Sequence, residues 1–201
     1  MLVDSETKIT FSKHELVCLQ DTDFLLTKRA IDHKVQTLLL KLASELANEP
    51  SALPLAPVRT KISRGENYRG LPYWVLDYSA IFTQENTFAY RTICRWGHEF
   101  SFTLHLAGAF LDDHKAALIA SYDKLALTPG LCLCINTTQW EHHFEQDNYR
   151  LFNEVVVDGN EWKGFLSGRE FVKLAIKMHL DEWDGVVERG VEVWRGFNKI
   201  V

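Results

Sequence analysis

The chain has 201 residues, of which 46% are hydrophobic and 24% charged, and this composition excludes an intrinsically disordered protein. A chain of this length predicts one domain over residues 1–201, large enough to build its core without a metal or a disulfide. The formal net charge of −5 argues against general nucleic-acid binding, because phosphate recognition needs a basic surface.

The first twenty residues carry five Asp, Glu and Lys side chains and no apolar core stretch, so we predict no signal peptide. No apolar run reaches the roughly 18 residues of a membrane span, and no membrane partner is expected. Cys18, Cys94, Cys132 and Cys134 lack the spacing of a disulfide framework. We therefore predict a cytoplasmic protein with free thiols.

Two helices are predicted at the N-terminus. Ser12 and Glu15 have the spacing of a capping box, in which a hydroxyl and a carboxylate satisfy the free amides of a helix start. A short helix should follow to about residue 19, and the Asp21-Thr22-Asp23 cluster begins a longer one. Its apolar residues recur at helical spacing and predict one stripe facing a core: Phe24, Ile31, Val35, Leu38, Leu42 and Leu46. Pro50, Pro54 and Pro57 end this helix in an extended connector.

Four strands are expected at about residues 58–64, 71–78, 88–96 and 99–107, from their β-branched and aromatic content. Gly97-His98 is typical of a tight hairpin turn. A two-residue loop there would place Tyr90 opposite His105 and point Arg91 to the other face. The face with Tyr90 and His105 would be polar and aromatic, either solvent-exposed or lining a pocket. The other, more apolar face would pack on helices.

The C-terminal half is predicted to contain a helix from Asp112-Asp113 to about residue 124 and a buried strand at 131–135. Ser167 and Glu170 have the spacing of a second capping box. It should begin a long C-terminal helix with one apolar stripe: Val172, Ile176, His179, Trp183 and Val187. This order of elements predicts an α+β fold, with a mainly antiparallel sheet of about five strands packed against helices and helices at both termini.

No sequence motif in the chain identifies a metal or cofactor site. Cys132 and Cys134 should share one face of a strand, but no second pair completes a tetrahedral site, so buried structural cysteines are expected. His142 and His143 are adjacent and point apart. Phosphate-loop, dinucleotide and serine-hydrolase motifs are absent as well. We predict neither a metal nor a cofactor.

The candidate ligand-binding residues come from the strand region and are chosen for guanidinium, phenol and imidazole chemistry: Arg64, Tyr68, Tyr90, Arg91, Arg95 and His105. Arg64 belongs to a basic stretch with Arg59, Lys61 and Arg69, which fits a small anion or a solvated strand edge. Arg91 and Arg95 either recognise a carboxylate or phosphate, or pair with Asp77 or Asp112.

Three hypotheses of function follow. The first is a non-enzymatic protein that binds a small organic or anionic ligand, or a protein partner, against the sheet. The second is an enzyme with His105 or His98 as acid–base and Tyr90, Tyr78 or Asp77 orienting it. The third is an interaction module in which Trp183 and Trp194 on the C-terminal helix anchor a partner or a second copy, giving a homo-oligomer.

Short sequence blocks in the strand region resemble a family of uncharacterised bacterial proteins. The blocks are Gly65-Glu66-Asn67-Tyr68, Gly70-Leu71-Pro72-Tyr73, Leu76-Asp77-Tyr78, Trp96-Gly97, Phe100-Ser101 and Leu104-His105-Leu106. The resemblance is one of sequence over about a quarter of the chain. Over the remainder it is only one of the order of predicted helices and strands. It implies a bacterial cytosolic origin and assigns no activity, catalytic residue or ligand.

Overall fold

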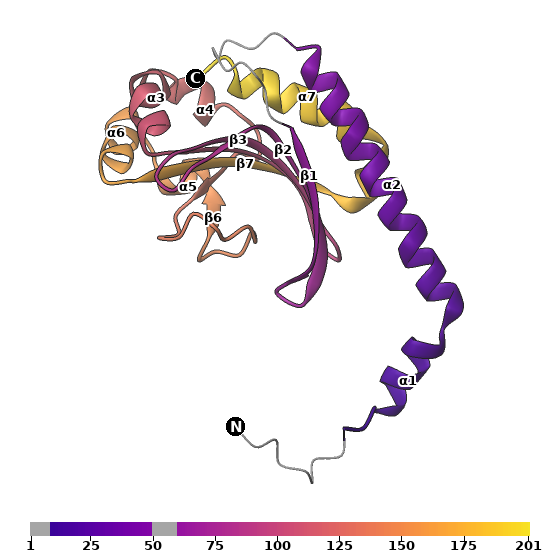
Figure 1. The fold of residues 1–201 in the computed structure, drawn as a ribbon. Coiled ribbons are helices and arrows are strands. Elements are labelled where there is room, and N and C mark those ends of the chain that lie inside the picture. Colours follow the sequence, from indigo (N-terminus) through magenta and orange to yellow (C-terminus); the bar gives the residue numbers. More distant parts are fainter. Residues whose placement is uncertain (1–8, 50–59) are drawn as a thin grey trace.

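The computed structural model describes residues 9–49 and 60–201. One strongly curved antiparallel sheet of seven strands organises them, in the order β1-β2-β3-β4-β7-β5-β6 (Figure 1). The strands are β1 (Lys61–Tyr68), β2 (Leu71–Phe82), β3 (Thr87–Arg95), β4 (Glu99–Ala107), β5 (Cys132–Cys134), β6 (Tyr149–Leu151) and β7 (Phe171–His179). The α+β class and the antiparallel sheet are thus confirmed, with seven strands where about five were predicted.

Most helices cover one face of the sheet, and the segment 135–148 lies against the other (Figure 1). The helices are α1 (Lys13–Gln20), α2 (Thr22–Ala47), α3 (Ala109–Ala120), α4 (Tyr122–Ala126), α5 (Phe152–Val155), α6 (Gly159–Ser167) and α7 (Val186–Phe197). A 3-10 turn, η1 (Leu180–Gly185), links β7 to α7. Helices lie at both ends of the described chain, as predicted. Among the described residues, no helix has the length and apolar character needed to cross a membrane.

The predicted starts of the N-terminal helices are confirmed. The Ser12 hydroxyl accepts a hydrogen bond from the Glu15 amide at 3.2 Å, and the Glu15 carboxylate accepts one from the Ser12 amide at 2.6 Å. The Asp21 side chain accepts from the Phe24 amide at 2.9 Å and begins α2. These local bonds satisfy amides that have no partner within the helix.

The predicted apolar stripe of α2 is buried only in its C-terminal half. Val35, Leu42 and Leu46 lie in the core, together with Leu39, which was not predicted. Phe24 and Ile31 were expected in the core and are instead 54% and 39% exposed. The reason is length, because 26 residues make a helix of roughly 39 Å that extends past the edge of the sheet.

The predicted register of the β3–β4 hairpin is wrong by one residue. Residues 96–98 form a three-residue loop in which Gly97 has a φ of +73° and the His98 amide donates to the Arg95 carbonyl at 3.1 Å. Tyr90 therefore pairs with Leu104 rather than with His105. Because side chains alternate along a strand, this one-residue shift places Tyr90 and His105 on opposite faces of the sheet.

The corrected register gives the hairpin one apolar face, which packs on α2 and α7. Its members are Phe88, Tyr90, Phe100, Phe102, Leu104 and Leu106, and all are fully buried. The Tyr90 hydroxyl donates to the Gly190 carbonyl of α7 at 2.6 Å. A Cβ on Gly190 would lie 2.8 Å from Leu42 Cδ1, so glycine allows α7 to approach α2 closely.

The predicted C-terminal helix over Val172 and Ile176 is wrong, because residues 171–179 form β7 in the sheet between β4 and β5. Ser167 ends α6 instead of beginning a helix, and Asp158 caps α6 by accepting from two amides at 2.8 Å. Apolar residues alternate along β7 from Val172 to Met178. An alternating pattern and a helical pattern coincide at several of these positions, which explains the error.

Other predicted elements are recovered with changed bounds. The helix expected at 112–124 is divided at Ser121 into α3 and α4, and the strand at 131–135 contains β5. The strand expected at 58–64 begins at Lys61 within the described residues. The proline connector and Arg59 lie outside the described residues.

Candidate functional site

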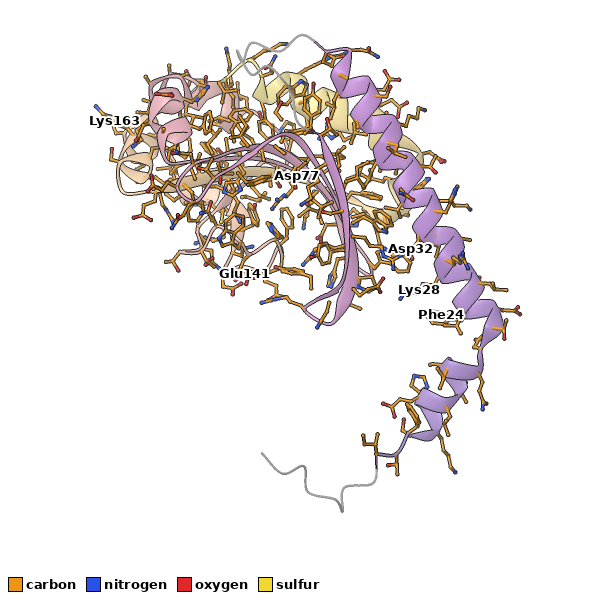
Figure 2. The ribbon with its side chains drawn as sticks, viewed as in Figure 1. Phe24, Lys28, Asp32, Asp77, Glu141 and Lys163 are labelled. Carbon is orange, nitrogen blue, oxygen red and sulfur yellow. The ribbon has the colours of Figure 1, made fainter. Side chains whose placement is uncertain are left out.

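A polar face of the sheet lies opposite the helices. Alternation along the strands points one set of side chains to this face: Asp77, Arg91, Arg95, Thr103, His105 and Lys173. Figure 2 shows Asp77 on the sheet and Glu141 on the segment below it. The segment 135–148 covers part of this face, so buried polar groups and a cavity lie between the two.

The cavity on this face has a volume of about 280 Å³. Its walls come from β1, β2, β3 and the covering segment, and include Lys61, Ser63, Tyr68, Tyr73, Arg95 and Trp140. Three cationic groups line it, contributed by Lys61, Arg91 and Arg95, against one carboxylate, that of Asp77. The Arg95 guanidinium is already paired with Glu99 outside the cavity lining, through Nε at 2.7 Å.

Arg91 and Asp77 form a buried bidentate ion pair between β3 and β2. Arg91 Nε donates to Asp77 Oδ1 at 2.6 Å and Nη2 donates to Oδ2 at 3.1 Å. The two residues are direct cross-strand partners, which explains the close geometry. The structure thus realises the pairing alternative for Arg91, with Asp77 and not Asp112 as its partner.

His142 of the covering segment extends this pair. Its Nε2 lies 3.2 Å from Arg91 Nη1, and since guanidinium only donates, Nε2 accepts and the ring proton is on Nδ1. Burial, together with the positive charge of Arg91, lowers the pKa of His142 well below its usual value. His142 is therefore neutral at physiological pH and acts as an acceptor.

Tyr68 fastens the covering segment to the end of β1. Its hydroxyl donates to Glu141 Oε2 at 2.8 Å and accepts from the amides of His142 at 2.8 Å and His143 at 3.1 Å. Burial raises the pKa of the Tyr68 phenol, so it stays protonated and keeps donating. One side chain thereby positions three consecutive residues over the sheet.

Lys173 of β7 is fully buried on the polar face. Its Nζ donates to the Glu141 carbonyl at 2.5 Å and lies 5.2 Å from the centre of the Tyr149 ring. Burial is the main cause that lowers the pKa of Lys173 to about 8. A buried ammonium held by a carbonyl and an aromatic ring is a second link between the sheet and the covering segment.

His105 lies further along the same face and does not line the cavity. Its Nε2 donates to Gln139 Oε1 at 2.8 Å, while Nδ1 is buried and has no hydrogen-bond partner among the described residues. Burial, followed by the charges of Lys173 and Arg91, lowers the pKa of His105 to about 3. The imidazole is neutral at physiological pH, and its free nitrogen is an acceptor.

The six predicted site residues are divided by the structure. Tyr68, Arg91 and Arg95 meet at the cavity, and His105 shares their face. Tyr90 lies in the core on the other face, so the Tyr90–His105 proton-transfer pair is not assembled. Arg64 lies at the sheet edge, where it pairs with Asp32 at 3.0 Å and Glu66 at 2.8 Å.

Of the two anchors proposed for an interaction module, Trp194 lies inside the protein and Trp183 is half-buried. Trp194 is fully buried against Tyr78 and Tyr90, and Trp183 packs against Phe100 with ring centres 5.7 Å apart. The Tyr78 hydroxyl donates to the Leu46 carbonyl on the helical side, so Tyr78 does not orient His105. These residues stabilise the core.

Sequence reasoning missed two important residues of the site. Lys173 was missed because residues 171–179 were taken for a helix, although a lysine inside an alternating apolar strand is a signal of a buried polar face. His142 was considered only as a metal ligand. Nothing in the local sequence around residue 142 indicates that this segment folds over Arg91, since the contact spans 51 positions.

One group of possible metal ligands occurs on the covering segment among the described residues. Ligand atoms of His143, Glu145 and Asp147 lie within 4.8 Å of one another. Glu145 already holds Arg69 through a 2.6 Å ion pair, which neutralises one carboxylate. The Arg69–Glu145 ion pair thus links the covering segment to the turn after β1. The cysteines are free, with Cys94, Cys132 and Cys134 buried and Cys18 half-buried.

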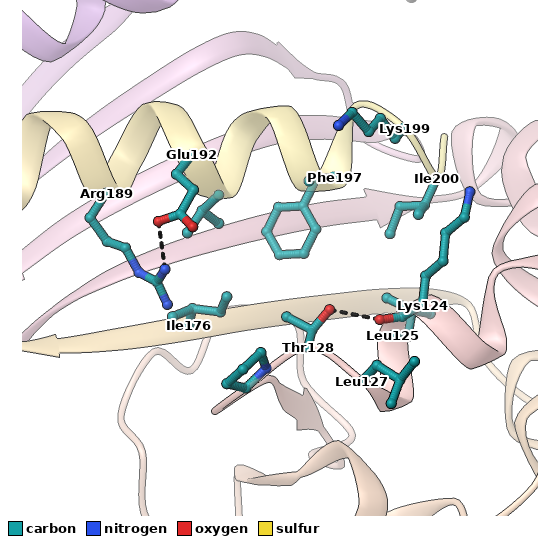
Figure 3. A pocket seen from close by; sticks show the side chains of 13 residues that line it. Lys124, Leu125, Leu127, Thr128, Ile176, Arg189, Glu192, Phe197, Lys199 and Ile200 are labelled. Carbon is teal, nitrogen blue, oxygen red and sulfur yellow. Dashed lines mark hydrogen bonds and ion pairs between the residues drawn. The ribbon is translucent and has the colours of Figure 1, made fainter.

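A second cavity of about 330 Å³ opens on the helical side, between the end of α7 and the turn after α4. Figure 3 shows Ile176, Phe197 and Ile200 around an apolar interior. Lys124 and Lys199 lie at its rim, and Arg189 is held by Glu192 at 2.7 Å. Its apolar character contrasts with the polar cavity on the opposite face.

No protein-family model matches this chain, and neither curated proteins nor solved structures gave a match. The resemblance to uncharacterised bacterial proteins in the strand region stays a prediction.

Proposed function

We propose that the protein binds a small anionic organic molecule in the cavity between the sheet and residues 135–148, without catalysing a reaction. The observation that carries this proposal is the excess of cationic groups in a small, partly aromatic cavity. Guanidinium and ammonium groups recognise carboxylate and phosphate oxygens through charge-assisted hydrogen bonds. A volume of about 280 Å³ lies just below the usual range for ligand sites, which favours a small ligand.

Two groups in the cavity have donors left for a ligand. The hydrogen bond of Arg95 to Glu99 uses Nε, so its two Nη groups are available to the cavity. Lys61 is exposed and forms no ion pair with another described residue. The anionic group would bind between Arg95 and Lys61, with the Ser63 hydroxyl nearby, while Tyr73 and Trp140 would contact the organic part. Each guanidinium nitrogen of Arg91 already donates to Asp77 or His142, so Arg91 would position the wall.

The acid–base alternative has weaker support. A general base works best when its pKa is near the operating pH, and burial lowers the pKa of His105 to about 3. The pKa of His142 is lowered as well, and its Nε2 is occupied by Arg91. Among the described residues, neither imidazole has a hydrogen-bonded carboxylate or phenol partner that would restore basicity. Binding is the function that these environments favour.

The test is isothermal titration with benzoate, succinate and phenyl phosphate on the wild type and on Lys61→Gln and Arg95→Gln. Loss of one charge-assisted hydrogen bond should weaken binding by about ten- to hundred-fold. Lys199→Gln, at the rim of the second cavity, is the matched control and should leave affinity unchanged. If Lys61→Gln and Arg95→Gln bind the ligand as tightly as the wild type, or if only Lys199→Gln weakens binding, the ligand does not bind in the polar cavity.

A further inference from the structure

The N-terminal arm, defined as residues 9–34, projects from the body of the protein (Figure 1). Helix α1 has no buried residue, and every buried residue of α2 lies at position 35 or later. Large apolar side chains on the arm are exposed: Ile9, Phe11, Leu16, Val17, Leu19, Phe24, Leu25, Leu26 and Ile31. Nine exposed apolar side chains within 26 residues indicate a contact surface.

The arm continues the apolar stripe by which α2 packs on the core. Phe24, Ile31, Val35 and Leu42 follow one another at steps of seven, four and seven residues, so they share one side of the helix. Val35 and Leu42 are buried against the body, while Phe24 and Ile31 have the same orientation beyond the sheet edge. The N-terminal end of this apolar face therefore has no partner among the described residues.

Polar contacts hold the arm in this extended position. Lys28 Nζ lies 3.0 Å from Glu66 Oε2, and Asp32 accepts from Arg64 at 3.0 Å and from the Trp74 indole at 2.8 Å. Figure 2 shows Phe24, Lys28 and Asp32 on the side of α2 that faces the sheet. Because the arm is fixed by β1 and β2, a partner would meet a preformed surface.

The charges of the arm point to the kind of partner. Residues 9–34 contain four Lys or Arg and four Asp or Glu side chains, so the arm is neutral overall. A helix that lies on an anionic membrane surface is typically rich in Lys and Arg, which does not fit this balance. The acidic residues come early, at Glu15, Asp21 and Asp23, and the basic residues dominate later, at Lys28, Arg29 and Lys34. When two copies of the arm run antiparallel, the acidic first part of each arm therefore lies beside the basic last part of the other.

We propose that two copies of the protein dimerise by packing their arms antiparallel around a twofold axis near Thr27 and Lys28. In this arrangement Phe24 of one copy packs on Ile31 of the partner subunit, and the reverse contact follows by symmetry. At about 100° per residue, Asp23 and Lys34 lie on the same flank of the stripe. The antiparallel pairing therefore brings Asp23 beside Lys34 of the partner subunit.

Light scattering coupled to size exclusion, over a dilution series of the full chain, measures the dimer directly. Wild type should be a dimer that dissociates on dilution, and Phe24→Ser/Ile31→Ser should raise the dissociation constant by about tenfold or more. Leu127→Ser removes an exposed leucine from the body, at 82% exposure, and should leave the dimer intact. A wild-type monomer throughout the series, or a dimer insensitive to the arm variants, would overturn the proposal.

Charge reversal tests the antiparallel pairing. Asp23→Lys and Lys34→Asp should each weaken the dimer, and the double variant should restore it. Thr27→Cys in a Cys18→Ser background should form a symmetric disulfide-linked dimer on mild oxidation, because Thr27 lies next to the axis. Absence of both rescue and crosslink would refute the pairing. Vesicle flotation that depends on Phe24 and Ile31 would show a lipid surface as the partner and also overturn the proposal.

Discussion

The buried ion pair between Arg91 and Asp77 gives the sharpest test of how the polar face is stabilised. The side chains are only 12% and 7% exposed and share two hydrogen bonds. Asp77→Asn keeps the shape but removes the negative charge, which leaves the Arg91 cation buried without its counter-ion. Breaking a buried pair by removing one partner typically costs about 3–5 kcal/mol.

We expect Asp77→Asn to cost about 3 kcal/mol, at the lower end of that range. Arg91 keeps its contact with His142 and lies over the Phe82 ring at 5.1 Å, so part of its environment survives. Replacing both partners together, as in Asp77→Leu/Arg91→Met, should cost less than either single change because no charge is left unpaired. Urea unfolding followed by circular dichroism measures each free energy of unfolding.

The chain offers a matched surface pair as control. Arg195 and Glu49 form the same bidentate geometry, at 2.6 and 2.7 Å, but the Arg195 side chain is 61% exposed. Exposed ion pairs are screened by water and contribute little, so Glu49→Gln should be much milder than Asp77→Asn. Equal losses in the two variants would refute the argument that burial sets the cost.

Three further outcomes are expected. Burial holds the pKa of Lys173 at about 8, below its unfolded value of about 10.5. Between these two pH values only the unfolded chain keeps the proton, so the free energy of unfolding of the wild type should increase relative to that of Lys173→Met as pH rises from about 8 to about 10.5. The pKa of His105 is lowered to about 3, so its contribution to the free energy of unfolding is lost as pH falls from about 6.5 to about 3. The stability of His105→Gln should therefore depend less on pH in this range than that of the wild type, and an equal pH dependence of the two proteins would contradict this. Gly190→Ala should cost about 1–3 kcal/mol through its clash with Leu42, whereas Gly164→Ala, with open space around it, should stabilise by about 0.5–1 kcal/mol, both measured by urea unfolding.

The hairpin illustrates the limit of local reasoning. Gly97 identified the turn, but two-residue and three-residue loops both accept glycine there. The choice between them depends on which side chains face α2 and α7. With the three-residue loop Arg91 and Arg95 move to the polar face, and Phe100, Phe102, Leu104 and Leu106 join Phe88 and Tyr90 on the apolar face. Burial of that face decided the register.

Strand β7 illustrates a second limit. Val172 and Ile176 fit both a helical stripe and an alternating strand, so a nine-residue segment does not distinguish the two. Pairing with β4, some 70 positions earlier, resolved the ambiguity by satisfying the backbone of both strands. Placement of Lys173 in the site followed from this pairing.

Local sequence patterns were enough to predict the features that depend on neighbouring residues: the caps at Ser12 and Asp21, the stripe of α2 and the four-strand succession from β1 to β4. These depend on interactions between residues a few positions apart, which the chain order specifies directly. Long-range packing placed the segment 135–148 against the sheet, paired Asp77 with Arg91 and left the first half of α2 outside the core. Each of those outcomes depends on contacts between distant segments, for which the local sequence allows many alternatives and only the burial of the whole chain selects one.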